Sequence, residues 1–284
     1  MTERLVVGIS GQPSGESALE WALDYAAAHH ADIELVHVVD DKWPSRSKAV
    51  AGEAFLRAEQ ELRDTAERAV ERFPGLRVHP DVAQGSPIDA LVARAADADL
   101  LVVGTHTLPR FEGLVFSTRA AHAAALAAGS VVVVPEGRPL AGAGVVVGVD
   151  GSASSVAAVE FAAREADRLG QSLRAVFAWR AVTPWTTVDD DAENSEPTDN
   201  DRLLLSEAVV GLPEEYPDLR VDLELSRSLP ADALVDAAAG ARLLVVGTHG
   251  RHGITKLWLG SVGHELILAM PCPVAVLKPP ATAP

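Results

Sequence analysis

The sequence is poor in sulfur: among its 284 residues there is a single cysteine, Cys272, and only two methionines. One cysteine cannot form an intramolecular disulfide, which excludes a disulfide-stabilised secreted scaffold and is typical of a reducing compartment. No stretch approaches the roughly 18 consecutive apolar residues that a membrane-spanning helix needs. The first four residues lead directly into the apolar run 5–7, without the pattern of an export signal. We therefore expect a cytoplasmic protein that does not enter a membrane.

Positive charge is also scarce, since 24 Lys and Arg residues face 40 Asp and Glu residues, a formal net charge of -16. A surface of this sign repels nucleic acid unless a dense basic patch intervenes, and the sequence has none, so nucleic-acid binding is not expected. Acidic residues cluster in segment 186–201, which has seven Asp and Glu side chains and no Lys or Arg. This segment cannot bury a core and predicts a solvated loop. The alternative is a lid over a ligand crevice.

The chain is an internal repeat, and the repeat defines the architecture. The heptapeptide LLVVGTH occurs twice without change, 143 residues apart, and other matches follow the same order along the chain. The matching segments are 6–9 with 146–149, 20–22 with 160–162, 87–92 with 230–235, and 100–106 with 243–249. Two domains of nearly equal size are therefore expected, 1–140 and 141–284, joined within the Pro- and Gly-rich segment 135–144.

Each copy alternates short β-branched runs with helical patterns, which predicts an α/β fold with an open parallel sheet covered by helices on both faces, as in Rossmann-like domains. For the second copy we expect strands at about 144–149, 173–179, 219–225, 242–247 and 273–278, and helices at about 153–169, 200–211, 230–239 and 261–269. Five strands in the common order 3-2-1-4-5 place a ligand crevice at the carboxyl ends of the first and fourth strands.

The loop after the fourth strand of the second copy has the composition of a phosphate site. Gly247 and Gly250 are followed, after nine residues, by Gly260 and Ser261, where an apolar helix begins. Glycines allow the backbone to approach an anion closely, and the first amides of a helix attract negative charge. Arg251 would add charge from within the loop. Asp150, after the first strand, would lie across the crevice, placed for ribose hydroxyls or a divalent metal.

These motifs, together with the final strand PCPVAVLK at 271–278, resemble those of tandem universal stress proteins of the ATP-binding branch, over essentially the whole chain. The resemblance implies that the loop binds the phosphates, that Asp150 contacts the ribose and Mg²⁺, and that backbone at the end of the second strand contacts adenine. The implied nucleotide-binding residues are Val149, Asp150, Ala178, Val246, Gly247, Gly250, Arg251, Gly260, Ser261 and Val262. Gly263 departs from the family, which usually has Ser or Thr there.

The first copy lacks several of these features. Thr107 and Ser117 replace two of the loop glycines, and Ser10 replaces the carboxylate after the first strand. A β-carbon at the loop positions would crowd the phosphates and restrict the backbone. We therefore expect the first copy to bind ATP weakly or not at all.

Simpler interpretations stay open for the same residues. The loop glycines can be turn residues that serve packing alone, and Asp150 can be a cap of the following helix. His249, His252 and His264 match no common zinc spacing, so they are expected to be solvated or packed. Cys272 is expected to be a small packing residue.

Three functions are compatible with these motifs. The first is an ATP-binding regulatory module of a stress or growth-arrest response, whose nucleotide state is read by a partner protein. The second is a slow Mg²⁺-dependent ATPase or phosphotransferase; the sequence shows no general base beside the loop, so at most weak hydrolysis is expected. The third is a nucleotide-free protein that only dimerises. In the resembled family the last strands pair between domains, which implies an intrachain pseudo-dimer, and a homodimer is expected as well.

Overall fold

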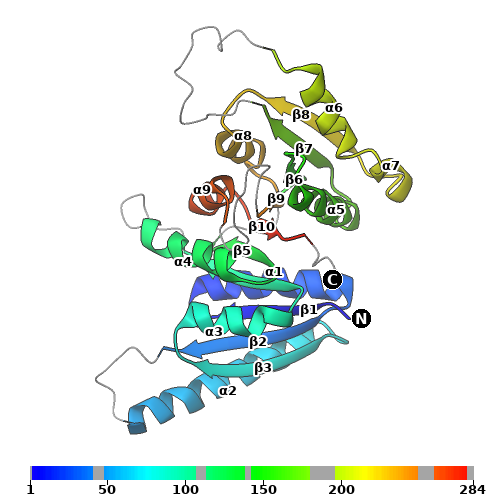
Figure 1. Cartoon of the computed structure of the whole chain (residues 1–284). Helices are drawn as coiled ribbons and strands as arrows, with labels where there is room; N and C mark the ends of the chain where they lie inside the picture. Colours follow the sequence, from blue (N-terminus) through cyan, green and yellow to red (C-terminus); the bar gives the residue numbers. More distant parts are fainter. Residues whose placement is uncertain are drawn as a thin grey trace, which may run out of the picture. The chain divides into compact units, whose positions relative to one another are not determined.

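The computed structural model describes residues 2–40, 48–106, 113–137, 142–179, 196–248 and 259–279. Residue contacts divide the chain into two units, Met1–Leu140 and Ala141–Pro284, the same two segments that the repeat defines. Each unit alternates strands and helices along the chain (Figure 1).

The first unit is built on a parallel sheet of five strands in the order β3-β2-β1-β4-β5. Its strands are β1 (Arg4–Ile9), β2 (Asp32–Val39), β3 (Arg77–Gln84), β4 (Leu100–Thr105) and β5 (Ser130–Pro135). Its helices are α1 (Pro13–His29), α2 (Lys48–Arg72), α3 (Pro87–Arg94) and α4 (Gly113–Leu126), with the short 3₁₀ turn η1 (Ala95–Asp97) after α3.

The second unit repeats this topology with the order β8-β7-β6-β9-β10, again all parallel. Its strands are β6 (Val145–Gly148), β7 (Leu173–Ala178), β8 (Val221–Ser226), β9 (Leu243–Gly247) and β10 (Val274–Leu277). Its helices are α5 (Ala153–Arg168), α6 (Asp199–Glu207), α7 (Leu212–Glu215), α8 (Pro230–Ala237) and α9 (Ser261–Ala269). The fold class and the strand order expected within each copy are confirmed.

The central strands explain why the sheets are covered on both faces. In β1, Leu5, Val6 and Val7 are all fully buried, and in β9 the run from Leu243 to Val246 is at most 4% exposed. Apolar runs without polar alternation require cover on both sides. In the first unit, α1 and α2 pack on one side of the sheet, and α3 and α4 pack against each other on the other side (Figure 1). In the second unit, α5 and α6 cover one side of the sheet, and α8 and α9 cover the other.

The acidic segment is only partly a loop. Residues 180–195 lie outside the described part of the chain, but Asp199 to Asp201 form the first turn of α6. Thr198 caps this helix: its side chain accepts from the Asp201 N–H at 3.2 Å, and the Asp201 carboxylate accepts from the Thr198 N–H at 2.8 Å. The expected helix start at about residue 200 is confirmed, whereas the overlapping prediction of a solvated loop through residue 201 was wrong at its end, because carboxylates there stabilise a helix N-terminus.

The helix boundaries otherwise follow their expected signals. Pro87 and Pro230 occupy the first turns of α3 and α8, where a missing N–H costs nothing. The single turn of α7 was not anticipated from the sequence, and α6 ends four residues earlier than expected. Within the described residues, no helix is long and apolar enough to span a membrane.

Candidate functional site

The strand ends predicted to form the crevice of the second unit lie next to one another at the carboxyl edge of its sheet. Strand β6 lies between β7 and β9, with Gly148 opposite Val176 and Val147 opposite Val245. Continuing these registers by two residues brings Asp150 level with Ala178 and Val149 level with Gly247. Three segments far apart in the sequence therefore meet at one edge, as the topology predicts.

Helix α9 starts at this same edge. Gly260 is its N-cap, with φ -60° and ψ 156°, and its N–H donates to the Thr248 carbonyl at 2.9 Å. That bond holds the helix start against the end of β9. The amides of Ser261 and Val262 belong to the first turn, where a helix offers no internal acceptor. They form, with the positive end of the helix dipole, the anion-attracting feature that the sequence predicts.

Asp150 is held in a fixed turn, and it is not the helix cap. Its Oδ1 accepts from the Ser152 N–H at 2.9 Å, and its own N–H donates to Ser155 Oγ at 3.2 Å. The cap of α5 is Ser152, whose hydroxyl accepts from the Ser155 N–H at 3.1 Å. The interpretation of Asp150 as a cap is corrected by this geometry, since the carboxylate precedes the cap by two residues.

Gly247 has a packing reason of its own. A β-carbon at this position would lie 2.6 Å from Ser154 Oγ and 2.8 Å from the Ser154 carbonyl carbon, at the first turn of α5. A β-carbon at the equivalent Gly104 of the first unit would collide more severely, with the backbone carbonyl of Ser14. Because both units retain this glycine, close contact between strand and helix accounts for it without a phosphate.

Several predicted residues are outside the described part of the chain. Gly250 and Arg251 belong to this group, as do His249 and His252. Among the residues that the structure describes, no three His, Cys, Asp or Glu side chains come together as a metal site. A Mg²⁺ ion at Asp150 would then take its other ligands from phosphate oxygens and water, which is how Mg²⁺ is commonly bound.

Lys278 is a charged residue near this edge that the sequence analysis did not single out. It follows directly on β10, in which Leu277 lies opposite Gly247 and accepts from the Thr248 N–H at 3.0 Å. Burial of the side chain lowers the pKa of its ammonium group from the ordinary value of 10.5. The available signal was its position as the first charge after an apolar strand.

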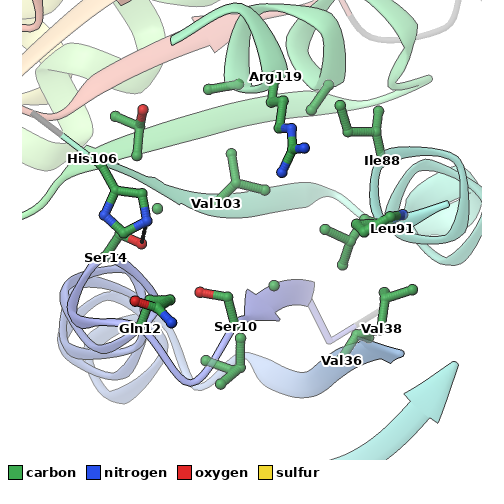
Figure 2. A pocket seen from close by; sticks show the side chains of 18 residues that line it. Ser10, Gln12, Ser14, Val36, Val38, Ile88, Leu91, Val103, His106 and Arg119 are labelled. Atoms are coloured by element: carbon green, nitrogen blue, oxygen red, sulfur yellow. Dashed lines mark hydrogen bonds between the residues drawn. The ribbon is translucent and has the colours of Figure 1, made fainter. Parts of the chain in front are cut away.

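The crevice of the first unit is a cavity of about 510 Å³ (Figure 2). Ser10 stands at the position of Asp150, so the carboxylate is missing while the hollow is retained. Both apolar and polar side chains line this cavity. The apolar lining includes Val36, Val38, Ile88, Leu91 and Val103, and the polar lining includes Ser10, Gln12, Ser14, His106 and Arg119. Loss of the expected nucleotide motifs has therefore not filled the crevice.

The fold defines a tandem, doubly wound α/β protein, in which the strand order reverses between the first and fourth strands of each unit. Residues 1–135 and 144–278 both match the universal stress protein family. The chain belongs to the universal stress protein family.

Relatives support this assignment along the whole chain. A universal stress protein of Mycolicibacterium smegmatis is 30% identical over 292 residues, covering 97% of each protein. One from Mycobacterium tuberculosis is 30% identical over 294 residues, covering 96% of each. Among solved structures, a universal stress protein from Archaeoglobus fulgidus superposes with a TM-score of 0.75 at 16% identity, covering 97% of this chain and 96% of that one. At this identity the likeness concerns the fold alone.

Proposed function

We propose that the second unit binds ATP with Mg²⁺ and that the protein is a nucleotide-dependent regulatory module of a stress or growth-arrest response. The observation that carries the proposal is the start of α9: Gly260 is bonded to Thr248, so that the first-turn amides lie at the same sheet edge as Asp150. An anion-attracting helix start opposite a carboxylate suits a ligand that carries both phosphates and a metal or hydroxyl groups.

Each part of ATP has a group to receive it in this proposal. The amides of Ser261 and Val262 bind phosphate oxygens, together with Gly250 and Arg251 of the preceding loop. Asp150 binds the ribose hydroxyls or Mg²⁺. Backbone at Ala178, where β7 ends, contacts adenine. Val149 and Val246 form apolar walls at the ends of the neighbouring strands.

The test is a calorimetric titration of MgATP into the full chain and into Gly260→Val. The φ of -60° at Gly260 suits any residue, so the substitution adds bulk at the phosphates without backbone strain. Losing one or two charge-assisted hydrogen bonds costs about 1.5–3 kcal/mol each, which weakens the Kd by about 10- to 100-fold or more. Gly211→Val is the matched control, because Gly211 begins α7 with φ -84° and no atom within 4 Å of an added β-carbon.

A Gly260→Val protein that binds ATP as tightly as the native chain contradicts the proposal, as does a native chain without ATP affinity. Asp150→Ala, with Ser10→Ala as its counterpart in the first unit, then separates the metal and ribose contribution from the phosphate contribution. Titration with and without Mg²⁺ shows whether Asp150 acts through the ion.

Slow ATP hydrolysis is the second candidate, and it is favoured by the position of Asp150 alone. A carboxylate that holds Mg²⁺ stabilises charge on the phosphates but does not activate water by itself. We propose binding without efficient turnover. Phosphate release measured with saturating MgATP decides between the two, because a rate that falls with Asp150→Ala assigns an ATPase.

Assembly and location complete the proposal. We infer that the protein forms a homodimer and acts in the cytoplasm on a regulatory protein partner. A net charge of -16 favours a protein or small-molecule partner over nucleic acid. Light scattering of the eluting protein, with and without ATP, measures the mass and any response to nucleotide.

A further inference from the structure

A serine, a histidine and a glutamate line up at one end of the cavity in the first unit. Ser14 Oγ lies 3.4 Å from His106 Nε2, and His106 Nδ1 is hydrogen-bonded to the Glu136 carboxylate. We propose that this group is a hydrolytic site, with Ser14 as nucleophile, His106 as general base and Glu136 as the positioning residue, and that its substrates are esters with short apolar acyl groups. Figure 2 shows His106 directly above Ser14 at the cavity wall.

The three side chains come from three elements that the sheet topology brings together. Ser14 is in the first turn of α1, His106 follows β4, and Glu136 follows β5. The Glu136 N–H donates to the Thr105 carbonyl at 2.9 Å, which extends the pairing of β4 and β5 and fixes the glutamate beside the histidine. Ser14 is only 4% exposed, and His106 and Glu136 are partly buried.

Hydrogen-bond chemistry determines which group donates and which accepts in each of these contacts. An ionised carboxylate can only accept, so His106 Nδ1 is the donor to Glu136. In a neutral imidazole the other nitrogen then carries a lone pair, and Nε2 accepts from the Ser14 hydroxyl. This is the tautomer that a general base for a serine nucleophile requires. The 3.4 Å distance agrees with the looser contacts that such groups show without substrate.

The cavity offers room and complementary walls for an ester. Its volume of about 510 Å³ holds a small molecule, and Val36, Val38 and Leu91 provide an apolar side for the acyl chain. The side chain of Gln12 lies at the Ser14 end, where its amide group would donate a hydrogen bond to an oxyanion. The Thr105 hydroxyl, in the cavity lining, is buried without a hydrogen-bond partner in the described part of the chain.

The second unit shows that the arrangement is not a consequence of the fold. Ser154 is the repeat counterpart of Ser14, and its hydroxyl lies 3.1 Å from the Ser152 hydroxyl. The counterpart of Glu136 is Pro279, which cannot orient an imidazole. The first unit therefore has an acid at the end of its last strand, while it has lost the acid at the end of its first strand, where Ser10 replaces Asp150.

The reaction is written as ordinary acyl transfer to water. The Ser14 Oγ–H gives its proton to His106 Nε2 as Oγ forms a bond to the ester carbonyl carbon, whose oxygen takes the negative charge. The carbon–oxygen bond to the alcohol then breaks, and the leaving alkoxide takes the proton from Nε2. Water attacks the acyl-serine, gives a proton to Nε2, and the proton returns to Oγ as the carboxylic acid leaves. No oxidant, metal or nucleotide is involved.

The first experiment labels the full-length protein with a fluorophosphonate, which forms a phosphorus–oxygen bond to an activated serine and releases fluoride. Peptide mass spectrometry is expected to find the adduct on Ser14. Ser14→Ala should abolish the labelling, and Ser154→Ala, the matched control in the second unit, should leave it unchanged. Both variants remove one oxygen, and thermal melts verify that they are folded.

The second experiment measures hydrolysis of p-nitrophenyl butyrate at several pH values. Ser14→Ala and His106→Gln should each lower kcat by about 100-fold or more, as expected for loss of a nucleophile or a general base. Glu136→Gln should lower kcat by at least about 10-fold with a changed pH profile, and Glu136→Asp should recover part of the lost kcat.

An adduct on another residue, no adduct on the native chain, or hydrolysis unaffected by Ser14→Ala overturns the proposal. Added MgATP should leave the rate of ester hydrolysis unchanged, whether or not the second unit binds ATP. The test of the hydrolytic site is therefore independent of the nucleotide proposal.

Discussion

The two units have the same topology but differ at the carboxyl edges of their sheets. The second unit has Asp150 after its first strand and Pro279 after its last, whereas the first unit has Ser10 and Glu136 at these places. The strands themselves are nearly interchangeable, with the same heptapeptide in β4 and β9. The residue types of the two units thus differ at strand ends and loops. The shared scaffold fixes where these residues lie but does not restrict which residue types are present.

The difference between the units also separates packing from ligand binding. Both units have a glycine at the same repeat position, Gly104 or Gly247, because a side chain there would meet the first turn of the unit's first helix, α1 or α5. The nucleotide proposal depends on Gly250 and Gly260 of the second unit. The first unit has Thr107 and Ser117 at these two positions. Four experiments test this division, in order of decreasing effect.

The largest effect is expected from Gly104→Ala and Gly247→Ala. Both substitutions force backbone movement in a close-packed core, at a cost of about 1–3 kcal/mol each. Chemical denaturation should show a loss of stability in both variants, and a larger loss for Gly104→Ala, because its β-carbon would come closer to backbone atoms than that of Gly247→Ala. A Gly247→Ala protein of native stability with impaired ATP binding would instead assign this glycine to the ligand.

The next prediction concerns substitutions that give the first unit the nucleotide-binding residues proposed for the second unit. Ser10→Asp with Thr107→Gly and Ser117→Gly restores the carboxylate and the missing glycines. We expect ATP affinity at the first unit to rise by at least about tenfold, which is 1.4 kcal/mol. Calorimetry on a background of Gly260→Val measures this site alone. Unchanged affinity would show that the difference between the units lies elsewhere.

A smaller effect is expected at the helix caps. The Ser152 hydroxyl caps α5, whereas its counterpart Gln12 makes no side-chain cap bond to α1. Ser152→Ala should therefore lower the free energy of unfolding by about 1 kcal/mol, and Gln12→Ala should have little effect. Equal losses in the two variants, measured by urea denaturation, would contradict this asymmetry.

The smallest effect concerns Lys278, whose counterpart in the first unit is Pro135. Burial lowers the pKa of this lysine in the folded state, so the unfolded chain binds more protons between the two pKa values. The cost to stability is present at neutral pH and is lost as the pH rises toward 10.5. Lys278→Met should thus raise the melting temperature slightly at pH 7 and not above pH 10.5. A gain that persists at high pH would point to packing and not to charge.

The sequence was informative where local signals agree with the fold. The repeat, the apolar runs of β1 and β9 and the prolines of α3 and α8 define the elements, because burial on both faces and a fixed φ leave few alternatives. The end of the acidic segment was misassigned, since a carboxylate favours both a solvated loop and a helix N-terminus. The Ser14, His106 and Glu136 contacts were missed because the three residues are separated by up to 122 positions and match no local motif.

The sequence alone determined the two α/β units, their strand order and the edge at which the candidate site residues gather, since hydrophobic period and parallel crossovers permit little else. Only the tertiary structure decided which residues meet at that edge: Ser152 and not Asp150 as the cap, Ser154 against Gly247, and Ser14 beside His106. The physical reason is that hydrogen bonds and close contacts depend on distances of a few tenths of an ångström between elements, which no one-dimensional pattern records.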